Sequence, residues 1–368
     1  MAKTRDPAVE SLAAALARRT REAAPELALA LPDGRVRCVA CGHRCVVPPG
    51  LEGVCRVRFN RDGRLRVPTG YVSGLQIDPI EKKPFFHVLP GSEALSFGML
   101  GCDLHCPYCQ NWLTSQTLRD EASRAGPRDV DARTLVDTGE RAGTPVVVST
   151  YNEPLITAEW AVEVFGEARA RGMLCGFVSN GNATPEALRY LRPWAELYKI
   201  DLKGFRPETY RAVGARLEAV LDTIRAAHEL GFWVEVVTLV VPGFNDSREE
   251  LEGTAAFLAS VSEELPWHVT AFHADYRMAS TRDTTSADLA RAAAIGRAAG
   301  LRYVYAGNRP GALDGGEDTR CPGCAGTLVR RHGFTVLENR LGPDGACPDC
   351  RTAIPGIWRV AGTPPGAR

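Results

Sequence analysis

Residues 102–109 read CDLHCPYC, so Cys102, Cys106 and Cys109 stand at spacings of four and three residues. Three thiolates held this close can share one metal centre, whereas a disulfide would leave the third cysteine unpaired. Soft sulfur ligands select zinc, copper(I) or iron–sulfur clusters. Structural zinc takes four ligands, and no fourth cysteine follows nearby. The spacing favours a 4Fe–4S cluster with one iron open to an outside ligand. The alternatives are a zinc knuckle that borrows His105 and cysteines that are merely buried.

The composition is that of an ordinary globular protein. The chain has 368 residues, 45% of them hydrophobic, and its formal net charge is zero. Zero charge removes the electrostatic argument for a general nucleic-acid binder. No run approaches the roughly 18 apolar residues of a membrane helix. The apolar stretch near residue 12 is soon interrupted by arginines, so it does not resemble a signal peptide. We expect a cytoplasmic protein without membrane or nucleic-acid partners.

Eleven of the twelve cysteines fall into three clusters, which in a cytosolic chain indicates metal sites rather than disulfides. The exception, Cys175, lies in an apolar run and is expected in the core. The N-terminal cluster has the spacing CxxCxxxCx9C, which suits one tetrahedral metal. Structural zinc and an auxiliary iron–sulfur cluster both remain open, because both accept four thiolates. The ligands are Cys38, Cys41, Cys45 and Cys55.

The C-terminal cluster consists of two CPxC knuckles separated by 22 residues. This arrangement is typical of a zinc ribbon or a rubredoxin-like site, and we expect zinc. Such a module depends on its metal to fold. The ligands are Cys321, Cys324, Cys347 and Cys350.

Short apolar runs alternate with amphipathic stretches between residues 94 and about 310. This alternation predicts parallel βα units, too few for an eight-fold barrel. In such barrels, functional residues collect at the carboxyl ends of the strands. We expect strands at 95–100, 145–149, 174–179, 197–201, 232–241, 267–272 and 301–306, and helices near 132–142, 157–171, 185–193, 207–230, 247–262 and 285–299.

The motif CxxxCxxC with an aromatic residue, Tyr108, before the last cysteine resembles the signature of radical SAM enzymes. The stretches at 78–84, 110–112, 151–154, 201–203 and 305–308 resemble the branch that includes pyruvate formate-lyase activating enzyme. Within that branch the chain looks like the radical SAM member of the three-gene AmmeMemoRadiSam system. The resemblance implies a partial (β/α)6 barrel that binds a 4Fe–4S cluster and S-adenosylmethionine (SAM). Reductive cleavage of SAM would release a 5′-deoxyadenosyl radical, a chemistry that belongs to the cofactors.

The resemblance also implies SAM contacts at strand ends. Asn152 and Glu153 stand where relatives carry a Gly-Gly-Glu that binds the SAM amino group. Asp201 and Lys203 match an Asp-x-Lys that activating enzymes use at SAM, and His273 matches a histidine that reaches the ribose. The third strand ends on a polar turn that either contacts SAM or is only a tight loop. The predicted cofactor-binding residues are Tyr108, Asn152, Glu153, Ser179, Asn180, Asp201, Lys203 and His273.

The expected organisation has five parts. Residues 1–30 should form an N-terminal helix, 31–93 a cysteine-rich module with a β-rich connector, and 94–310 the barrel. A polar linker at 311–319 should lead to a zinc-ribbon-like module at 320–368. Residues 78–87 should run extended across the barrel mouth, either contacting substrate or SAM through Lys82, Lys83 and His87 or forming an ordered loop.

Lysine is rare in this chain. Of 44 basic residues only five are lysine, namely Lys3, Lys82, Lys83, Lys199 and Lys203. Wherever arginine would serve, this composition supplies arginine. The lysines are therefore candidates for positions that need a compact ammonium rather than a planar guanidinium.

A partial barrel leaves a lateral gap, so a protein or peptide substrate is expected, as for the activating enzymes. The resemblance implies Memo-like and AMMECR-like partner proteins and an electron donor such as flavodoxin or ferredoxin. Two alternatives remain: a glycyl-radical-enzyme activase, and a zinc-ribbon interaction protein whose cysteines are only structural.

Overall fold

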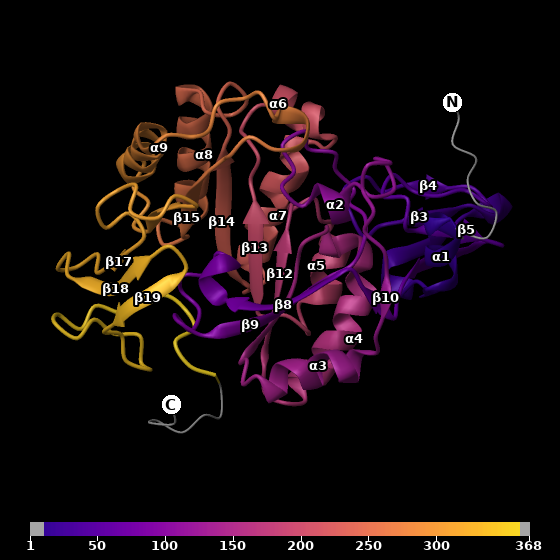
Figure 1. Cartoon of the computed structure of the whole chain (residues 1–368), viewed down its shortest axis with the longest axis horizontal. Helices are drawn as coiled ribbons and strands as arrows, with labels where there is room; N and C mark the ends of the chain where they lie inside the picture. Colours follow the sequence, from indigo (N-terminus) through magenta and orange to yellow (C-terminus); the bar gives the residue numbers. More distant parts are fainter. Residues whose placement is uncertain (1–10, 361–368) are drawn as a thin grey trace.

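An eight-stranded sheet forms the centre of the computed structural model, which describes residues 11–360 (Figure 1). Seven neighbouring strands are parallel, and β8 adds to one edge antiparallel to β9. The sheet curves without closing, because β8 and β16 remain its two edges. This confirms the predicted partial barrel. In spatial order the strands are β8 (Gly74–Pro79), β9 (Glu93–Gly98), β11 (Val146–Ser149), β12 (Leu174–Ser179), β13 (Leu197–Asp201), β14 (Trp233–Val240), β15 (Trp267–Ala271) and β16 (Val304–Gly307).

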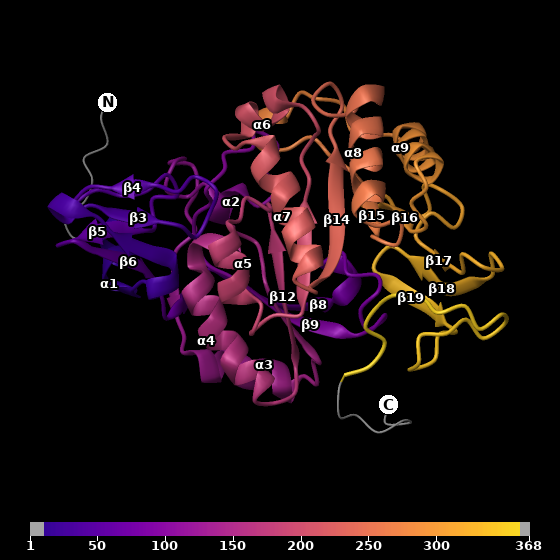
Figure 2. The ribbon, with the colours of Figure 1, turned by 180° about the vertical axis from the view of Figure 1, so that it is seen from behind.

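Helices cover the outside of the sheet (Figure 2). The strands are mostly apolar because they are buried on both faces. The side chain of Thr184 caps α5 by accepting from the backbone N–H of Ala187, and Pro185 follows at the first helical position. The helices are α3 (Ala132–Arg141), α4 (Ala158–Arg169), α5 (Pro185–Leu191), α6 (Pro207–Val213), α7 (Leu217–Glu229), α8 (Arg248–Val261) and α9 (Ser286–Ala298), with the short α2 (Trp112–Ser115) after the three-cysteine loop.

The helix expected near 207–230 is broken in two. Gly214 adopts a φ of 89° between α6 and α7, a conformation that side chains other than glycine rarely tolerate. A Cβ at this position would collide with the ring of His105, whose backbone N–H donates to the carbonyl of Val213 at 3.0 Å. The break therefore brings the three-cysteine loop against the turn between the helices.

The N-terminal helix is shorter than expected. Within the described residues it is α1 (Leu12–Arg18), while residues 1–10 of the predicted segment lie outside the description. Residues 20–30 instead form β1 (Thr20–Glu22), a 3-10 turn that starts at Pro25, and β2 (Ala28–Ala30). Pro25 has no N–H to donate, which opposes a continuous helix.

The cysteine-rich module consists of two small antiparallel sheets at one end of the long axis (Figure 1). A tight turn joins β5 to β6, with Asp62 and Gly63 both at positive φ. A buried ion pair holds the module to the barrel: Arg58 donates to both carboxylate oxygens of Glu159, at 2.6 and 2.9 Å. The strands are β3 (Val36–Cys38), β4 (Val46–Val47), β5 (Phe59–Arg61) and β6 (Arg64–Pro68), followed by β7 (Tyr71–Val72), which pairs with β10 (Arg128–Asp129).

Residues 78–87 are not extended throughout, contrary to the expectation. Asp78 and Pro79 end β8, and a 3-10 turn (Ile80–Lys82) then reverses the chain. The chain next enters the amino end of the barrel, where the carboxylate of Glu235 accepts the backbone N–H groups of Phe86 and His87 at 3.0 and 2.9 Å. Pairing with β9 and burial of Phe86 decide this path.

The C-terminal module packs directly on this end of the barrel (Figure 1). It is a three-stranded antiparallel sheet of β17 (Thr319–Arg320), β18 (Thr327–His332) and β19 (Thr335–Asn339). Its buried Arg331 donates to the carbonyl of Phe86 at 2.7 Å and lies 3.4 Å from Glu81. The expected linker is not a free tether, because Thr319 is buried and the carbonyl of Gly316 accepts from Ala306. Among residues 11–360 no helix is long and apolar enough to cross a membrane.

Candidate active site

The three-cysteine loop follows the carboxyl end of β9, and functional residues of parallel barrels collect at this end of the strands. None of the described cysteines forms a disulfide. The backbone N–H of Leu104 donates to the sulfur of Cys102 at 3.3 Å, and Ser115 lies 3.2 Å from the sulfur of Cys109. Burial raises the pKa of Cys106 to about 12, so a bare thiolate is disfavoured there. A bound metal centre would remove this penalty and hold the ligand deprotonated.

Asp103, within the motif, anchors the loop, and the sequence analysis missed this role. Its fully buried carboxylate accepts from the side-chain amides of Asn180 at 2.7 Å and Asn182 at 2.9 Å. Its backbone carbonyl contacts Nε2 of His43, from the N-terminal module, at 3.1 Å. The available signal was a carboxylate beside the first cysteine together with two asparagines in one turn.

Glu153 joins the ends of β11 and β12. Its carboxylate accepts from Ser179 Oγ and from the backbone N–H of Asn180, both at 2.7 Å. Burial, reinforced by the charge of Asp103, raises the pKa of Glu153 to about 8. Asn152 accepts from the backbone N–H of Met99 at 2.9 Å. These four predicted residues thus lie together beneath the cysteine loop, but they bond one another and the backbone and are not in the lining of the adjacent cavity.

A cavity of about 390 Å³ occupies the barrel interior next to the loop. Its volume falls in the range of small-molecule sites, roughly 300–1,000 Å³. Strand residues form its inner wall, the cysteine loop forms its carboxyl side, and the C-terminal module contributes Phe334. The lining residues are Lys82, Lys83, Pro84, Cys106, Tyr108, Cys109, Gln110, Asn111, Thr150, Tyr151, Val178, Lys199, Asp201, Leu202, Lys203, Val237, Leu239, Thr270, Asn308 and Phe334.

The structure therefore brings five predicted residues to one cavity: Cys106, Tyr108, Cys109, Asp201 and Lys203. Tyr108 is buried and packs edge-on against Phe244, with ring centroids 5.2 Å apart. His273 is not brought to the cavity: it is exposed just beyond β15 and does not line it.

Two aspartates organise the charges around this cavity. Asp201 forms ion pairs with Lys199 and, at 3.5 Å, with Lys203. Asp78 accepts from Lys82 at 2.7 Å and Lys83 at 2.6 Å. Burial opposes ionisation of Asp78, but hydrogen bonds from Lys82, Lys83 and Tyr151 outweigh it and lower its pKa to about 2.

Several lining residues are not among the predicted cofactor-binding residues, although Lys199 was noted as one of the rare lysines. Lys199 precedes the Asp-x-Lys motif by two residues, so strand alternation turns it to the same side. Phe334 sits between β18 and β19 of the distant C-terminal module, and no local pattern relates it to the barrel. His87, for which the sequence left open a contact with substrate or SAM or a place in an ordered loop, is buried at the amino end of the barrel, 2.6 Å from the hydroxyl of Tyr305.

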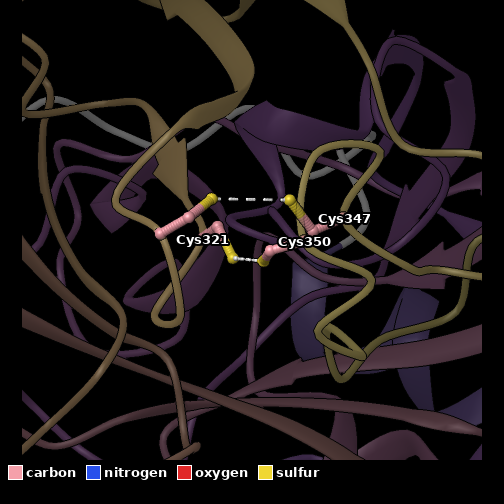
Figure 3. Close-up of side chains that lie close together, drawn as sticks. Cys321, Cys347 and Cys350 are labelled. Carbon is pink, nitrogen blue, oxygen red and sulfur yellow. Dashed lines mark hydrogen bonds between the residues drawn. The ribbon is translucent and has the colours of Figure 1, made fainter.

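The four C-terminal cysteines gather into one cluster of thiols, apart from the cavity (Figure 3). The sulfurs of Cys321 and Cys350 are 3.5 Å apart, and those of Cys324 and Cys347 are 3.7 Å apart. Tetrahedral zinc with Zn–S bonds near 2.3 Å needs sulfurs about 3.8 Å apart. The four side chains could therefore hold a metal ion. Within the described chain they are also the only group of three or more His, Cys, Asp or Glu side chains whose ligand atoms gather within 4.8 Å.

The N-terminal cysteines are less tightly gathered. Cys38, Cys41 and Cys55 are buried and Cys45 is half-buried, but no three of their sulfurs meet the 4.8 Å spacing. Arg58 is buried nearby, and its Nε has no hydrogen-bond partner in the described structure.

The chain is similar to known proteins in sequence. The model of the radical SAM superfamily matches residues 98–258. An uncharacterised protein of Methanocaldococcus jannaschii is 36% identical over 308 residues, covering 83% of this chain and 90% of the relative. The pyruvate formate-lyase-activating enzyme of Streptococcus mutans is 22% identical over 191 residues, covering 49% of this chain and 72% of that enzyme.

The chain belongs to the radical SAM superfamily. It is an enzyme of the radical SAM type in the branch of the pyruvate formate-lyase activating enzymes. The family match begins at the end of β9 and ends in α8, so it contains the cysteine loop and most of the barrel. A solved domain of pyruvate-formate lyase-activating enzyme from Bacteroides vulgatus aligns at 20% identity with a TM-score of 0.39, covering 44% of this chain and 98% of that domain.

Proposed function

We propose that this radical SAM enzyme binds a 4Fe–4S cluster through Cys102, Cys106 and Cys109 and cleaves SAM reductively. The observation that carries the proposal is that Cys106 and Cys109 line a cavity inside an open parallel barrel. When bound, the cluster and SAM supply the chemistry that generates a 5′-deoxyadenosyl radical. The chain's own residues bind, orient and shield these groups.

Two parts of the chain prepare the site. The bonds of Asp103 to Asn180 and Asn182 fix the cysteine loop before any ligand binds, which is the preorganisation that a reactive centre needs. At the opposite, amino end of the barrel, the buried side chain of Phe86 and the carboxylate of Glu235 form what we call the floor. Glu235 accepts the backbone N–H of Phe86, and this packing closes that route to water.

Within the cavity, Asp201 and Lys203 are the proposed SAM contacts, because both line it and both match the expected motif. A carboxylate can accept from the SAM ammonium, and an ammonium can donate to the SAM carboxylate. Glu153 already accepts three hydrogen bonds, so we propose that it positions the loop beside SAM. Contacts of Asn152, Ser179, Asn180 and His273 with SAM stay predictions.

A protein or peptide substrate is the second part of the proposal. The relatives named as activating enzymes support it, as does the unclosed barrel edge. Those names also make a glycyl-radical-enzyme activase the second candidate. Memo-like and AMMECR-like partners and a flavodoxin or ferredoxin donor rest on the sequence resemblance. Zinc is proposed for the C-terminal cysteines on the sulfur spacing.

Anaerobic reconstitution followed by measurement of 5′-deoxyadenosine tests the central proposal. Cys106→Ala should lose both the cluster absorbance and all SAM cleavage, because two thiolates cannot hold a three-ligand cluster. Cys175→Ala is the matched control: this cysteine is also fully buried, but it lies in β12 and does not line the cavity. If Cys106→Ala forms 5′-deoxyadenosine at the wild-type rate, the assignment is wrong.

A further inference from the structure

Four of the five lysines in the chain line one cavity: Lys82, Lys83, Lys199 and Lys203. The fifth, Lys3, lies outside the described residues. None of the arginines in residues 11–360 lines this cavity, although arginine is far more frequent in the chain. A random distribution of basic residues would not separate the two types in this way. The cavity is therefore lined by compact, strongly hydrated ammonium groups and not by planar guanidinium groups.

These lysines outnumber their partners. Asp78 is shared by Lys82 and Lys83, and Asp201 is shared by Lys199 and Lys203. Each ammonium has three donors, so one shared carboxylate leaves donors available on both members of each pair. The four cations and two carboxylates leave an excess of two positive charges.

The nearby carboxylate of Glu235 does not cancel this excess at the cavity. It lies at the amino end of the barrel and does not line the cavity. Its oxygens are taken by His268, by the indole N–H of Trp233 and by the backbone N–H groups of Phe86 and His87. Glu235 therefore belongs to the closed floor.

SAM does not account for the excess either. SAM has one carboxylate but also an ammonium and a sulfonium, so its net charge is about plus one. A cluster with three thiolates carries about minus one when oxidised. These two contributions roughly offset each other and leave the charge of the lysines unmatched.

We propose that the cavity binds, beside SAM, a substrate group that carries two negative charges, either a phosphate monoester or two adjacent carboxylates. This inference rests on the proposed function and narrows its substrate class. Lys82 is the most available donor, since its side chain is 48% exposed and forms one ion pair. Lys83 is buried and bonded to both Asp78 and the hydroxyl of Tyr151, so it holds the carboxylate in place. Phe334 adds an apolar surface for the rest of the molecule.

Calorimetric titration of the full-length, anaerobically reconstituted protein tests the site. The probes are inorganic phosphate and succinate, with acetate as the singly charged comparison, at one pH and one ionic strength. Phosphate or succinate should bind at least about 10-fold more tightly than acetate, and whichever binds better identifies the chemical source of the dianion. Lys82→Gln and Lys199→Gln should each weaken that binding by about 10–100-fold, the effect of one charge-assisted hydrogen bond.

Arg248→Gln is the matched control, because it removes the same charge from an exposed position on α8 and should leave dianion binding unchanged. Acetate binding as tightly as both dianions, or Lys82→Gln binding them like the wild type, would overturn the inference. Since Lys82 is half-exposed, its substitution should not prevent folding.

Formation of 5′-deoxyadenosine, measured on the same samples, separates this inference from the proposed function. A protein that cleaves SAM but binds no dianion contradicts only the substrate class. A protein that binds the dianion through these lysines but never cleaves SAM contradicts only the proposed reaction.

Discussion

At the amino end of the barrel a single carboxylate, Glu235, meets four donors, whereas at the cavity two carboxylates are shared among four lysines. The first arrangement satisfies a buried charge, as stability requires. The second leaves donors available to something that the chain does not provide. Buried charges of the same kind thus serve packing at one end of the barrel and binding at the other. Substitutions at the two ends should separate stability from ligand affinity.

The largest effect is expected at the floor. Glu235→Ala leaves four donors without an acceptor, among them His268 and the backbone of Phe86, and should lower the free energy of unfolding by about 3–5 kcal/mol. Urea unfolding measures this. The control is Glu252→Ala, which breaks an exposed pair with Arg248 and should cost less than about 1 kcal/mol. If the two variants unfold with equal free energies, the four hydrogen bonds to Glu235 do not stabilise the fold as we propose.

A smaller effect, on binding rather than on stability, is expected at the cavity. Lys203→Ala should weaken SAM binding by about 10–100-fold, equivalent to about 1.5–3 kcal/mol, while iron content stays unchanged. Lys203→Arg should not fully restore affinity, because the guanidinium is larger and planar. Calorimetric titration of reconstituted variants with SAM measures both. Wild-type affinity in Lys203→Ala would remove this residue from the SAM site.

The pH dependence of stability should report on the floor. Burial lowers the pKa of His87 to about 4, so the folded protein keeps it neutral while the unfolded chain protonates it near pH 6.5. Its contribution is present above pH 6.5 and is lost as the pH falls towards 4. This amounts to about 2 kcal/mol between pH 7 and pH 5.

Unfolding curves at pH 7 and pH 5 check this dependence. His87→Gln should flatten it, because glutamine does not titrate. His228→Gln, at an exposed position on α7, should keep the wild-type dependence. An unchanged slope in His87→Gln would contradict the assignment.

Substitutions of the C-terminal cysteines should have the smallest effect on the cavity and its cluster. Replacing the exposed Cys324 and Cys350 by serine should remove one zinc per chain, since these sulfurs complete the group of four. The iron content and the absorbance of the radical cluster should not change. Metal analysis and visible spectra measure this. Loss of iron instead of zinc would show that the C-terminal cysteines hold an iron site.

Local patterns in the sequence were sufficient for much of the barrel. All seven parallel strands were predicted, because strands buried on both faces read as short apolar runs between amphipathic helices. The positions where helices break were harder to predict from local patterns. The interruption at Gly214 places that residue against the ring of His105, over a hundred residues earlier in the chain. The strands between Thr20 and Ala30 depend on distant partners, because β1 pairs with β6 and β2 pairs with β3.

The sequence by itself determined which chemistry the cysteine loop favours, because three thiolates at this spacing restrict the metal centre whatever surrounds them. It also revealed that lysine is rare, but not that the lysines meet. Their convergence was decided by the tertiary structure: β8 adds to the edge of the sheet and carries Asp78, and the turn after it carries Lys82 and Lys83 towards Lys199 of β13. Strand alternation tells which side chains share a face, whereas the curvature of the sheet decides which faces enclose one cavity.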